Sequence, residues 1–182
     1  MKTAVKNLSP SVIEEFATQI RGGIVLPEDA NFNETRKVYN GMINKHPGMF
    51  VKCVDVADVI YSVNFARENN LLVAVRGGGH NGGGLGLCEE GLVIDLSGIK
   101  FIRVNTEEKT VRVGGGNIWG EVDHATHPFG LAVPAGIIST TGVGGLTLGG
   151  GVGHLSRKYG LTIDNLLEAD MVLADGSFVT VN

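Results

Sequence analysis

Residues 73–82 read Val-Ala-Val-Arg-Gly-Gly-Gly-His-Asn-Gly, an apolar run followed by Arg76 and a glycine loop that contains His80. Glycine permits positive φ and lets a ligand approach the backbone amides directly. Consecutive exposed amides form an anion cradle, and an arginine fork matches phosphate oxygens. A second glycine-dense stretch, residues 142–153, offers the same backbone features. Two such loops predict a large phosphate-bearing ligand with a reactive histidine nitrogen beside it.

The composition excludes several classes of protein. The chain has 182 residues, 43% hydrophobic and 19% charged, as expected for a globular protein, but its 28 glycines are about twice the usual share. The glycines follow no G-x-y period, which excludes a collagen-like chain. A net charge of −4 argues against a nucleic-acid partner. No apolar run has the length of a membrane span or a signal peptide, so we expect a cytoplasmic protein without a membrane partner.

The first hundred residues predict a βαβ unit. Ser9 and Pro10 suit the N-cap and first position of a helix that Gly22-Gly23 would end. Asp55 suits the N-cap of a second long helix, and a further helix is expected at residues 34–43. The expected strands lie at residues 24–26, 49–54 and 71–75, so that the last strand delivers the loop with His80.

The second half has a different pattern. Short strands are expected at residues 92–95, 101–104 and 110–113, and a helix capped by Asn117 extends to about His127. Residues 166–173 and 177–181 flank Asp175-Gly176, a strong hairpin signal. The sequence therefore predicts an α+β fold in which a βαβ half precedes a mostly antiparallel half, with the boundary near residue 100.

The loop also matches the dinucleotide pattern G-x-G-x-x-G at Gly77, Gly79 and Gly82, and Asp95 lies 18 residues beyond Gly77. A Rossmann site requires a helix to begin at the third glycine. The residues that follow, Gly-Gly-Leu-Gly-Leu, form helix poorly, so this alternative is disfavoured.

Other catalytic patterns are weak. There is no Walker-type loop and no G-x-S-x-G elbow, and His124 and His127 lack the carboxylates or thiolates that would complete a metal site. Cys53 and Cys88 fit no metal spacing, and Cys53 suits a buried apolar position. His80 could simply bond a backbone carbonyl in a turn, but the surrounding glycines and Arg76 favour a ligand contact.

The chain resembles the N-terminal part of FAD-linked oxidases of the vanillyl-alcohol oxidase and p-cresol methylhydroxylase type. Within them it is most similar to the berberine-bridge-enzyme-like and 6-hydroxynicotine-oxidase-like branch. The matching stretches, within a match that begins near Tyr39, are residues 73–81, 91–97, 134–153, 156–165 and 172–176. The resemblance implies two α+β subdomains that hold an extended FAD between them.

The resemblance also implies roles for single residues. The loop at residues 76–82 would wrap the pyrophosphate, and His80 would bond covalently to the 8α-methyl carbon of the flavin. Residues 136–145 would line the isoalloxazine and ribityl chain, and backbone near Met171 would meet the adenine. The expected cofactor-binding set is Arg76, Gly77, Gly78, Gly79, His80, Asn81, Gly82, Gly136, Thr140, Thr141, Gly142, Gly144, Gly145, Gly149, Asn165, Met171 and Val172.

The sequence departs from this family in three respects. Many relatives have a flavin-bonding cysteine where this chain has Ile138, which implies a single covalent link, and Cys88 lies outside that pattern. Plant relatives have a histidine where this chain has Leu146. The third departure is that the family's substrate domain, from which its catalytic base comes, is not expected in this chain. We expect residues 1–45 to form an N-terminal helix and lead-in, and residues 46–182 to form the FAD-binding domain.

We therefore expect the FAD-binding domain of a flavin-dependent oxidoreductase. In the longer enzyme a small-molecule substrate would give a hydride to flavin N5, and the electrons would pass to oxygen or another acceptor. The fragment alone would be inactive and would tend to self-associate. The alternative is a flavin-binding module without turnover, a truncated or decayed fragment.

Overall fold

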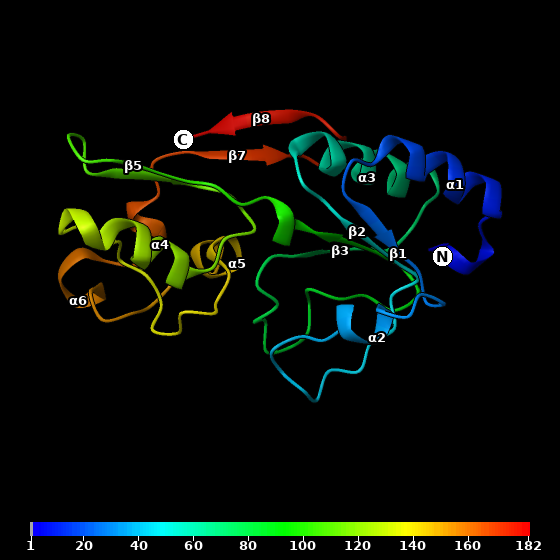
Figure 1. Cartoon of the computed structure of the whole chain (residues 1–182), viewed down its shortest axis with the longest axis horizontal. Coiled ribbons are helices and arrows are strands. Elements are labelled where there is room, and N and C mark those ends of the chain that lie inside the picture. The colour runs from blue at the N-terminus through cyan, green and yellow to red at the C-terminus, as the bar shows by residue number, and fades with distance from the viewer. Residues whose placement is uncertain (1) are drawn as a thin grey trace.

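A computed structural model describes residues 2–182, and its first half is built on a four-stranded sheet (Figure 1). The strands are β1 (Gly23–Val25), β2 (Met49–Lys52), β3 (Val73–Arg76) and β4 (Leu92–Asp95). Their order is β1-β2-β4-β3, with β4 parallel to both neighbours and β1 antiparallel to β2. Strand β4 thus lies between the two strands of the predicted βαβ unit.

Helices cover both faces of this sheet. The helices are α1 (Pro10–Gln19), α2 (Phe32–Thr35) and α3 (Val56–Glu68). On one face α1 and α3 pack through Phe16 and Phe65, whose rings stack with centroids 4.0 Å apart. On the other face Phe32 meets Phe50 edge-on at 6.1 Å, close to the glycine loop. Because both faces are covered, the strands β2 and β4 are almost completely buried.

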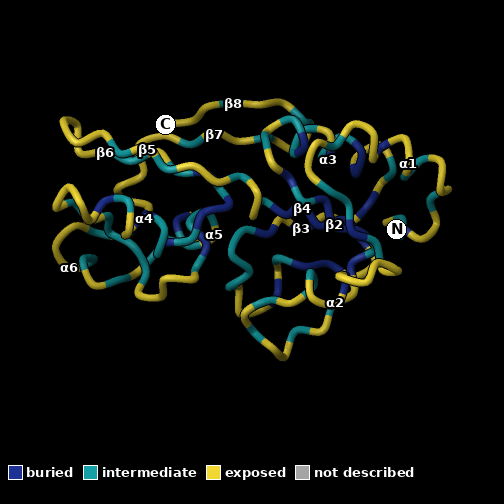
Figure 2. Tube along the Cα trace, viewed as in Figure 1, coloured by how far each residue is buried: buried dark blue, intermediate teal, exposed yellow. Residues whose placement is uncertain are grey.

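The second half consists of two hairpins and short helices (Figure 1). Its strands are β5 (Ile102–Asn105), β6 (Thr110–Val113), β7 (Ala169–Val172) and β8 (Phe178–Val181). Its helices are α4 (Trp119–Thr126), α5 (Val143–Leu148) and α6 (Ser156–Tyr159). Single 3₁₀ turns lie at Val5–Asn7, Leu96–Gly98, His127–Phe129 and Ile163–Asn165. Figure 2 shows that buried residues concentrate in the first half, and that β8 is largely exposed.

The β7–β8 hairpin connects the two halves. It extends along the molecule to α3 (Figure 1), where the Arg67 guanidinium donates to the Asp175 carbonyl at 2.7 Å. The turn at Gly176 has φ of +87°, and an added Cβ there would lie 2.2 Å from the side chain of Asn64. Glycine is therefore required at this turn for both conformation and space.

Several sequence predictions of local structure are confirmed. The Asp55 carboxylate accepts from the Asp58 amide at 3.1 Å, as expected of an N-cap. Ser9 and Pro10 begin α1 as predicted, although the Ser9 hydroxyl pairs with that of Ser11 instead of capping the helix. None of the helices formed by the described residues is long and apolar enough to cross a membrane.

Two predictions were wrong. The helix expected at residues 34–43 stops at Thr35, because the chain beyond it bonds to the glycine loop. Asn117 does not cap α4, since Ile118 occupies the N-cap and its amide donates to the Glu121 carboxylate at 3.0 Å. The Asn117 side chain is buried and instead connects the Phe101 amide to Glu121.

Candidate functional site

Arg76 ends β3, and the loop that follows turns at Gly79, whose φ of +69° favours glycine. His80 comes next and lies between side chains from two distant segments. Its Nε2 is 3.0 Å from the Thr140 hydroxyl and its Nδ1 is 3.4 Å from the Thr141 hydroxyl. The Tyr39 ring stacks on the imidazole, with centroids 4.1 Å apart and planes 18° apart. Both ring nitrogens and one ring face are thus in contact with protein.

Burial lowers the pKa of His80 from its ordinary value of 6.5, and a hydrogen bond with the Thr140 backbone opposes the shift only in part. Burial favours the neutral form because it disfavours charge. His80 is therefore a neutral imidazole at pH 7, with a lone pair on one nitrogen. A neutral imidazole can act as a nucleophile, which an imidazolium cannot.

The two glycine stretches touch at Gly78 and Gly142. A Cβ added at Gly78 would lie 2.3 Å from the Gly142 nitrogen, and one added at Gly142 would lie 2.3 Å from the Gly78 nitrogen. Only glycine fits on either side of this junction, because side chains pack no closer than about 3.5 Å. The junction sets Thr140 and Thr141 beside His80.

The guanidinium of Arg76 binds groups of the protein itself. It bonds the Asp95 carboxylate at 2.6 Å and the Thr35 carbonyl at 2.5 Å, and it lies 4.8 Å from the centre of the Phe50 ring. The partner carboxylate is 1% exposed and also accepts from the Ser97 amide at 3.1 Å. This differs from the expectation for Arg76, because the guanidinium expected to meet phosphate instead fixes the start of the loop. The buried, doubly bonded Asp95 agrees with the disfavoured standing of the dinucleotide alternative.

A cavity of about 390 Å³ opens beside Gly77, Gly78 and Gly79. Its other lining residues include Lys37, Lys52 and Lys100, along with polar groups from the ends of β2 and β4. Lys37 pairs with Glu34 at 2.5 Å and Lys100 with Glu121 at 2.6 Å. The wall therefore carries three ammonium groups near the loop backbone, two of them in ion pairs, together with the carboxylates of Glu34 and Asp95.

The remaining predicted site residues are divided between the second glycine stretch and β7. Helix α5 follows Gly142 directly, and Gly136 packs so closely on Leu146 that an added Cβ would lie 2.3 Å away. Asn165 donates from its amide to the carbonyls of Tyr159 and Leu161 at 2.9 and 2.8 Å, so it fixes a turn. Gly144 and Gly145 lie in α5, Gly149 is its C-cap, and Met171 and Val172 lie in β7.

Asn81 and Gly82 complete the loop. The Asn81 carboxamide oxygen accepts from the Leu85 amide at 3.0 Å, and the Gly82 carbonyl accepts from the Asn40 side chain at 2.8 Å. The structure thus brings residues 76–82 together with residues 140–142, and leaves Asn165, Met171 and Val172 on other elements.

Sequence reasoning missed the chain at residues 36–46, which borders the loop. Tyr39 contacts His80, Asn40 contacts Gly82, and Lys45 donates to the Gly84 and Leu87 carbonyls at 2.8 and 3.0 Å. No periodicity marks such a segment, because its side chains bond to backbone instead of forming a helix or strand face.

The other candidate groups are structural. Cys53 and Cys88 are free thiols in the two cores, and burial raises the pKa of Cys53 to about 12 and that of Cys88 above its usual range. Across residues 2–182, no cluster of three or more His, Cys, Asp or Glu side chains could hold a metal ion. Ile138 lies on the exposed stretch before Thr140.

Comparison with known proteins identifies the family. A model described as an FAD binding domain matches residues 47–182. The chain belongs to this FAD-binding domain family. The predicted fold and its assignment to the 6-hydroxynicotine-oxidase-like and berberine-bridge-enzyme-like branch are confirmed by sequence and structural relatives.

Two curated relatives illustrate the similarity of the domain. YgaK of Bacillus subtilis, described as an uncharacterised FAD-linked oxidoreductase, is 40% identical over 158 residues, which cover 87% of this chain and 35% of the relative. The (R)-6-hydroxynicotine oxidase of Paenarthrobacter nicotinovorans is 37% identical over 160 residues, which cover 88% and 35%. The chain therefore spans about 35% of the length of these relatives.

Solved structures share the domain as a whole. The 6-hydroxy-D-nicotine oxidase from Arthrobacter nicotinovorans superposes with a TM-score of 0.87 at 36% identity, covering 89% of this chain and 36% of that one. The wild-type BBE-like 1 protein of Physcomitrella patens gives a TM-score of 0.87 at 33% identity, covering 93% and 37%. Both chains are much longer than this one.

Proposed function

We propose that the loop at residues 77–82 and the stretch at residues 140–145 hold FAD, with His80 bonded to the flavin through one covalent link. The observation that carries this proposal is the position of His80, neutral and fixed between Thr140 and Thr141 where two glycine loops meet. Glycine backbones let phosphate approach the amides. Lys52, for which the structure shows no ion pair among residues 2–182, lines the cavity beside residues 77–79 and favours the same anionic group.

The covalent link would form at a ring nitrogen of His80. A C–N bond from His80 would replace one C–H bond of the 8α-methyl group, and the methyl hydrogen, the imidazole N–H hydrogen and their electrons would reduce dioxygen to hydrogen peroxide. Formation of the C–N bond requires a nitrogen lone pair, which a neutral imidazole has. Ile138 has no nucleophile, and the Cys88 thiol is buried among Leu72, Gly91 and Leu92, so a second link has no donor.

In the longer protein this domain would serve a flavin-dependent oxidoreductase. FAD supplies the hydride acceptor when bound, and the protein supplies binding and orientation. Relatives that carry the domain are described as FAD-linked oxidoreductases and as a 6-hydroxynicotine oxidase, which supports a small-molecule substrate. We further propose a cytoplasmic protein. The exposed Ile137, Leu148 and Val152 beside the second glycine stretch support self-association of the isolated domain.

Recognition of the phosphate-bearing part of FAD is tested by comparing FAD with riboflavin, which has the same ring system but lacks the pyrophosphate and the adenosine. Flavin fluorescence is followed as each is titrated with the purified chain. The proposal predicts that FAD binds at least about tenfold more tightly, equivalent to about 1.4 kcal/mol. Equal affinities would contradict a phosphate site at the loop.

Turnover separates the proposed enzyme domain from a flavin module without activity. The FAD-loaded chain is mixed anaerobically with candidate alcohols, amines and sugars, and flavin bleaching is recorded. We expect no bleaching by the isolated domain, because positioning of substrate against flavin N5 needs an opposing wall and a base. Bleaching in the longer protein would identify an oxidoreductase, and its absence there would favour the module.

A further inference from the structure

We propose that Tyr39 is a positioning residue for His80, and that residues 36–46 form a clamp that holds the glycine loop in its site geometry. This inference rests on the proposed role of His80 toward FAD. The family model begins at residue 47, so the clamp precedes it, although the similarity to a relative aligned over the whole chain includes residues 36–46. Its contacts reach the loop at Gly79, His80 and Gly82.

The clamp fixes the loop on both sides of His80. The Tyr39 amide donates to the Gly79 carbonyl at 3.1 Å, and the Asn40 side chain donates to the Gly82 carbonyl at 2.8 Å. Between these two bonds the Tyr39 ring lies flat on the imidazole at 4.1 Å. Backbone bonds hold the loop's path, and the stacked ring restricts rotation of the His80 side chain.

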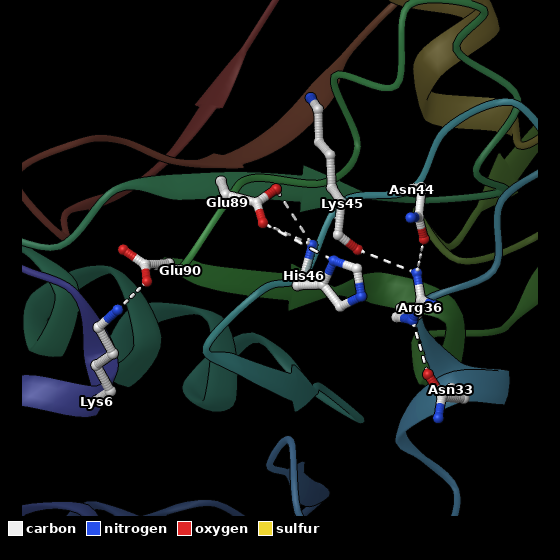
Figure 3. A network of polar contacts seen from close by, with 8 residues as sticks. All are labelled: Lys6, Asn33, Arg36, Asn44, Lys45, His46, Glu89 and Glu90. Carbon is white, nitrogen blue, oxygen red and sulfur yellow. Dashed lines mark hydrogen bonds and ion pairs between the residues drawn. The ribbon is translucent and has the colours of Figure 1, made fainter.

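The clamp is itself anchored at both ends. Figure 3 shows Arg36 pointing toward Asn33 and Asn44, whose carboxamide oxygens accept from its guanidinium at 2.9 and 2.7 Å. Beyond it, the His46 amide faces the Glu89 carboxylate, with N–O distances of 3.3 and 3.2 Å. These contacts fix both ends of the clamp at residues 36–46, and Tyr39 lies between them.

Three side chains hold the His80 imidazole, and they contact different parts of the ring. Thr140 and Thr141 contact its two nitrogens, while Tyr39 covers one ring face. Without the aromatic ring, the two hydroxyl contacts alone set the ring angle, and one face opens to water. Because Tyr39 is itself 63% exposed, its replacement removes the stack without opening a core cavity.

The test compares Tyr39→Leu, which removes the aromatic ring, with Tyr39→Phe, which keeps it. The matched control is Tyr61→Leu, since Tyr61 is also exposed, at 42%, but lies on α3. The imidazole protons of His80 are followed by NMR in the unliganded chain, with His80→Ala for assignment. We expect Tyr39→Leu to remove the ring-current shift and raise the His80 pKa toward 6.5, while Tyr39→Phe and Tyr61→Leu retain the native signals.

The second readout is the initial rate of flavin attachment on adding FAD. We expect a loss of about ten- to a hundredfold in Tyr39→Leu, because small misplacements of a reacting group cost rates of that order, and recovery in Tyr39→Phe. Unchanged His80 signals in Tyr39→Leu would overturn the positioning role, whether or not flavin attaches. Altered signals in that variant, with no flavin bond even in the wild-type chain, would support positioning and refute only the covalent link.

Discussion

The contact between Gly78 and Gly142 gives a prediction that can be worked from the structure. An alanine at position 78 would bring its Cβ to 2.3 Å from the Gly142 nitrogen and 2.7 Å from its Cα. Ordinary contact requires about 3.5–4.0 Å. The two backbones would therefore have to separate by more than about 1 Å, and neither clashing group is the end of a side chain that could rotate away.

Overpacking of this kind costs about 1–3 kcal/mol, and the rigid partners place Gly78→Ala in the upper part of that range, about 2–3 kcal/mol. For a chain of this length the melting temperature would fall by about 4–12 °C. Separation of the loops would also draw Thr140 and Thr141 away from His80. Both effects are measured on one sample, by thermal unfolding and by the NMR signals of His80.

Gly83→Ala is the control in the same loop. A Cβ there would meet only the Asn81 side chain, at an ordinary 3.5 Å, and its φ lies outside the positive range. It should leave both the melting temperature and the His80 signals close to wild type. If Gly78→Ala matched this control in both measurements, the two glycine stretches would not touch as described, and the account of the site would fail.

Further predictions concern buried groups. Asp95→Asn should lower the free energy of unfolding by about 3–5 kcal/mol, because it leaves the buried Arg76 unpaired. Glu34→Gln, in the exposed pair with Lys37, should lower it by no more than about 1 kcal/mol. Equal effects of the two variants in denaturant titrations would refute the structural role of the Arg76–Asp95 pair. The His80 pKa is lowered in the folded state, so its contribution to stability is complete above pH 6.5 and lost as pH falls through the folded pKa. That pH-dependent loss should disappear in His80→Ala, and an NMR midpoint above 6.5 would show the sign to be wrong. Cys53 and Cys88 should resist alkylation at pH 8 until denaturant is added, because burial raises both pKa values; rapid labelling of the folded chain would contradict their burial.

Local sequence signals predicted much of the fold. The Asp55 cap, the apolar strands and the Asp175-Gly176 turn are determined by residues close in sequence, and all appear in the structure. The role of Arg76 could not be found in this way. Arg76 and Asp95 are opposite one another only because β3 and β4 pair in parallel register, and the sequence alone does not specify that register.

In the candidate site, too, the local features could be predicted from the sequence and the contacts between distant segments could not. The loop at residues 77–82 stands out by its glycines. Its proximity to Thr140 and Thr141 follows only from the contact between the backbones of Gly78 and Gly142, which are far apart in sequence. Tyr39 carries no sequence signal because it lies in irregular chain whose partners are loop carbonyls and a ring face. Such contacts depend on the folded path of both segments.

The most direct test of the central claim is the mass of the peptide that contains His80. The purified chain is incubated with FAD and oxygen, precipitated with acid, washed and digested with trypsin, which cleaves after Arg76 and Lys100. The resulting peptide contains both His80 and Cys88, so fragmentation must locate the modification. We predict one flavin on His80, added with loss of two hydrogens, and none in His80→Ala. An unmodified peptide, or a flavin on Cys88, would contradict the account.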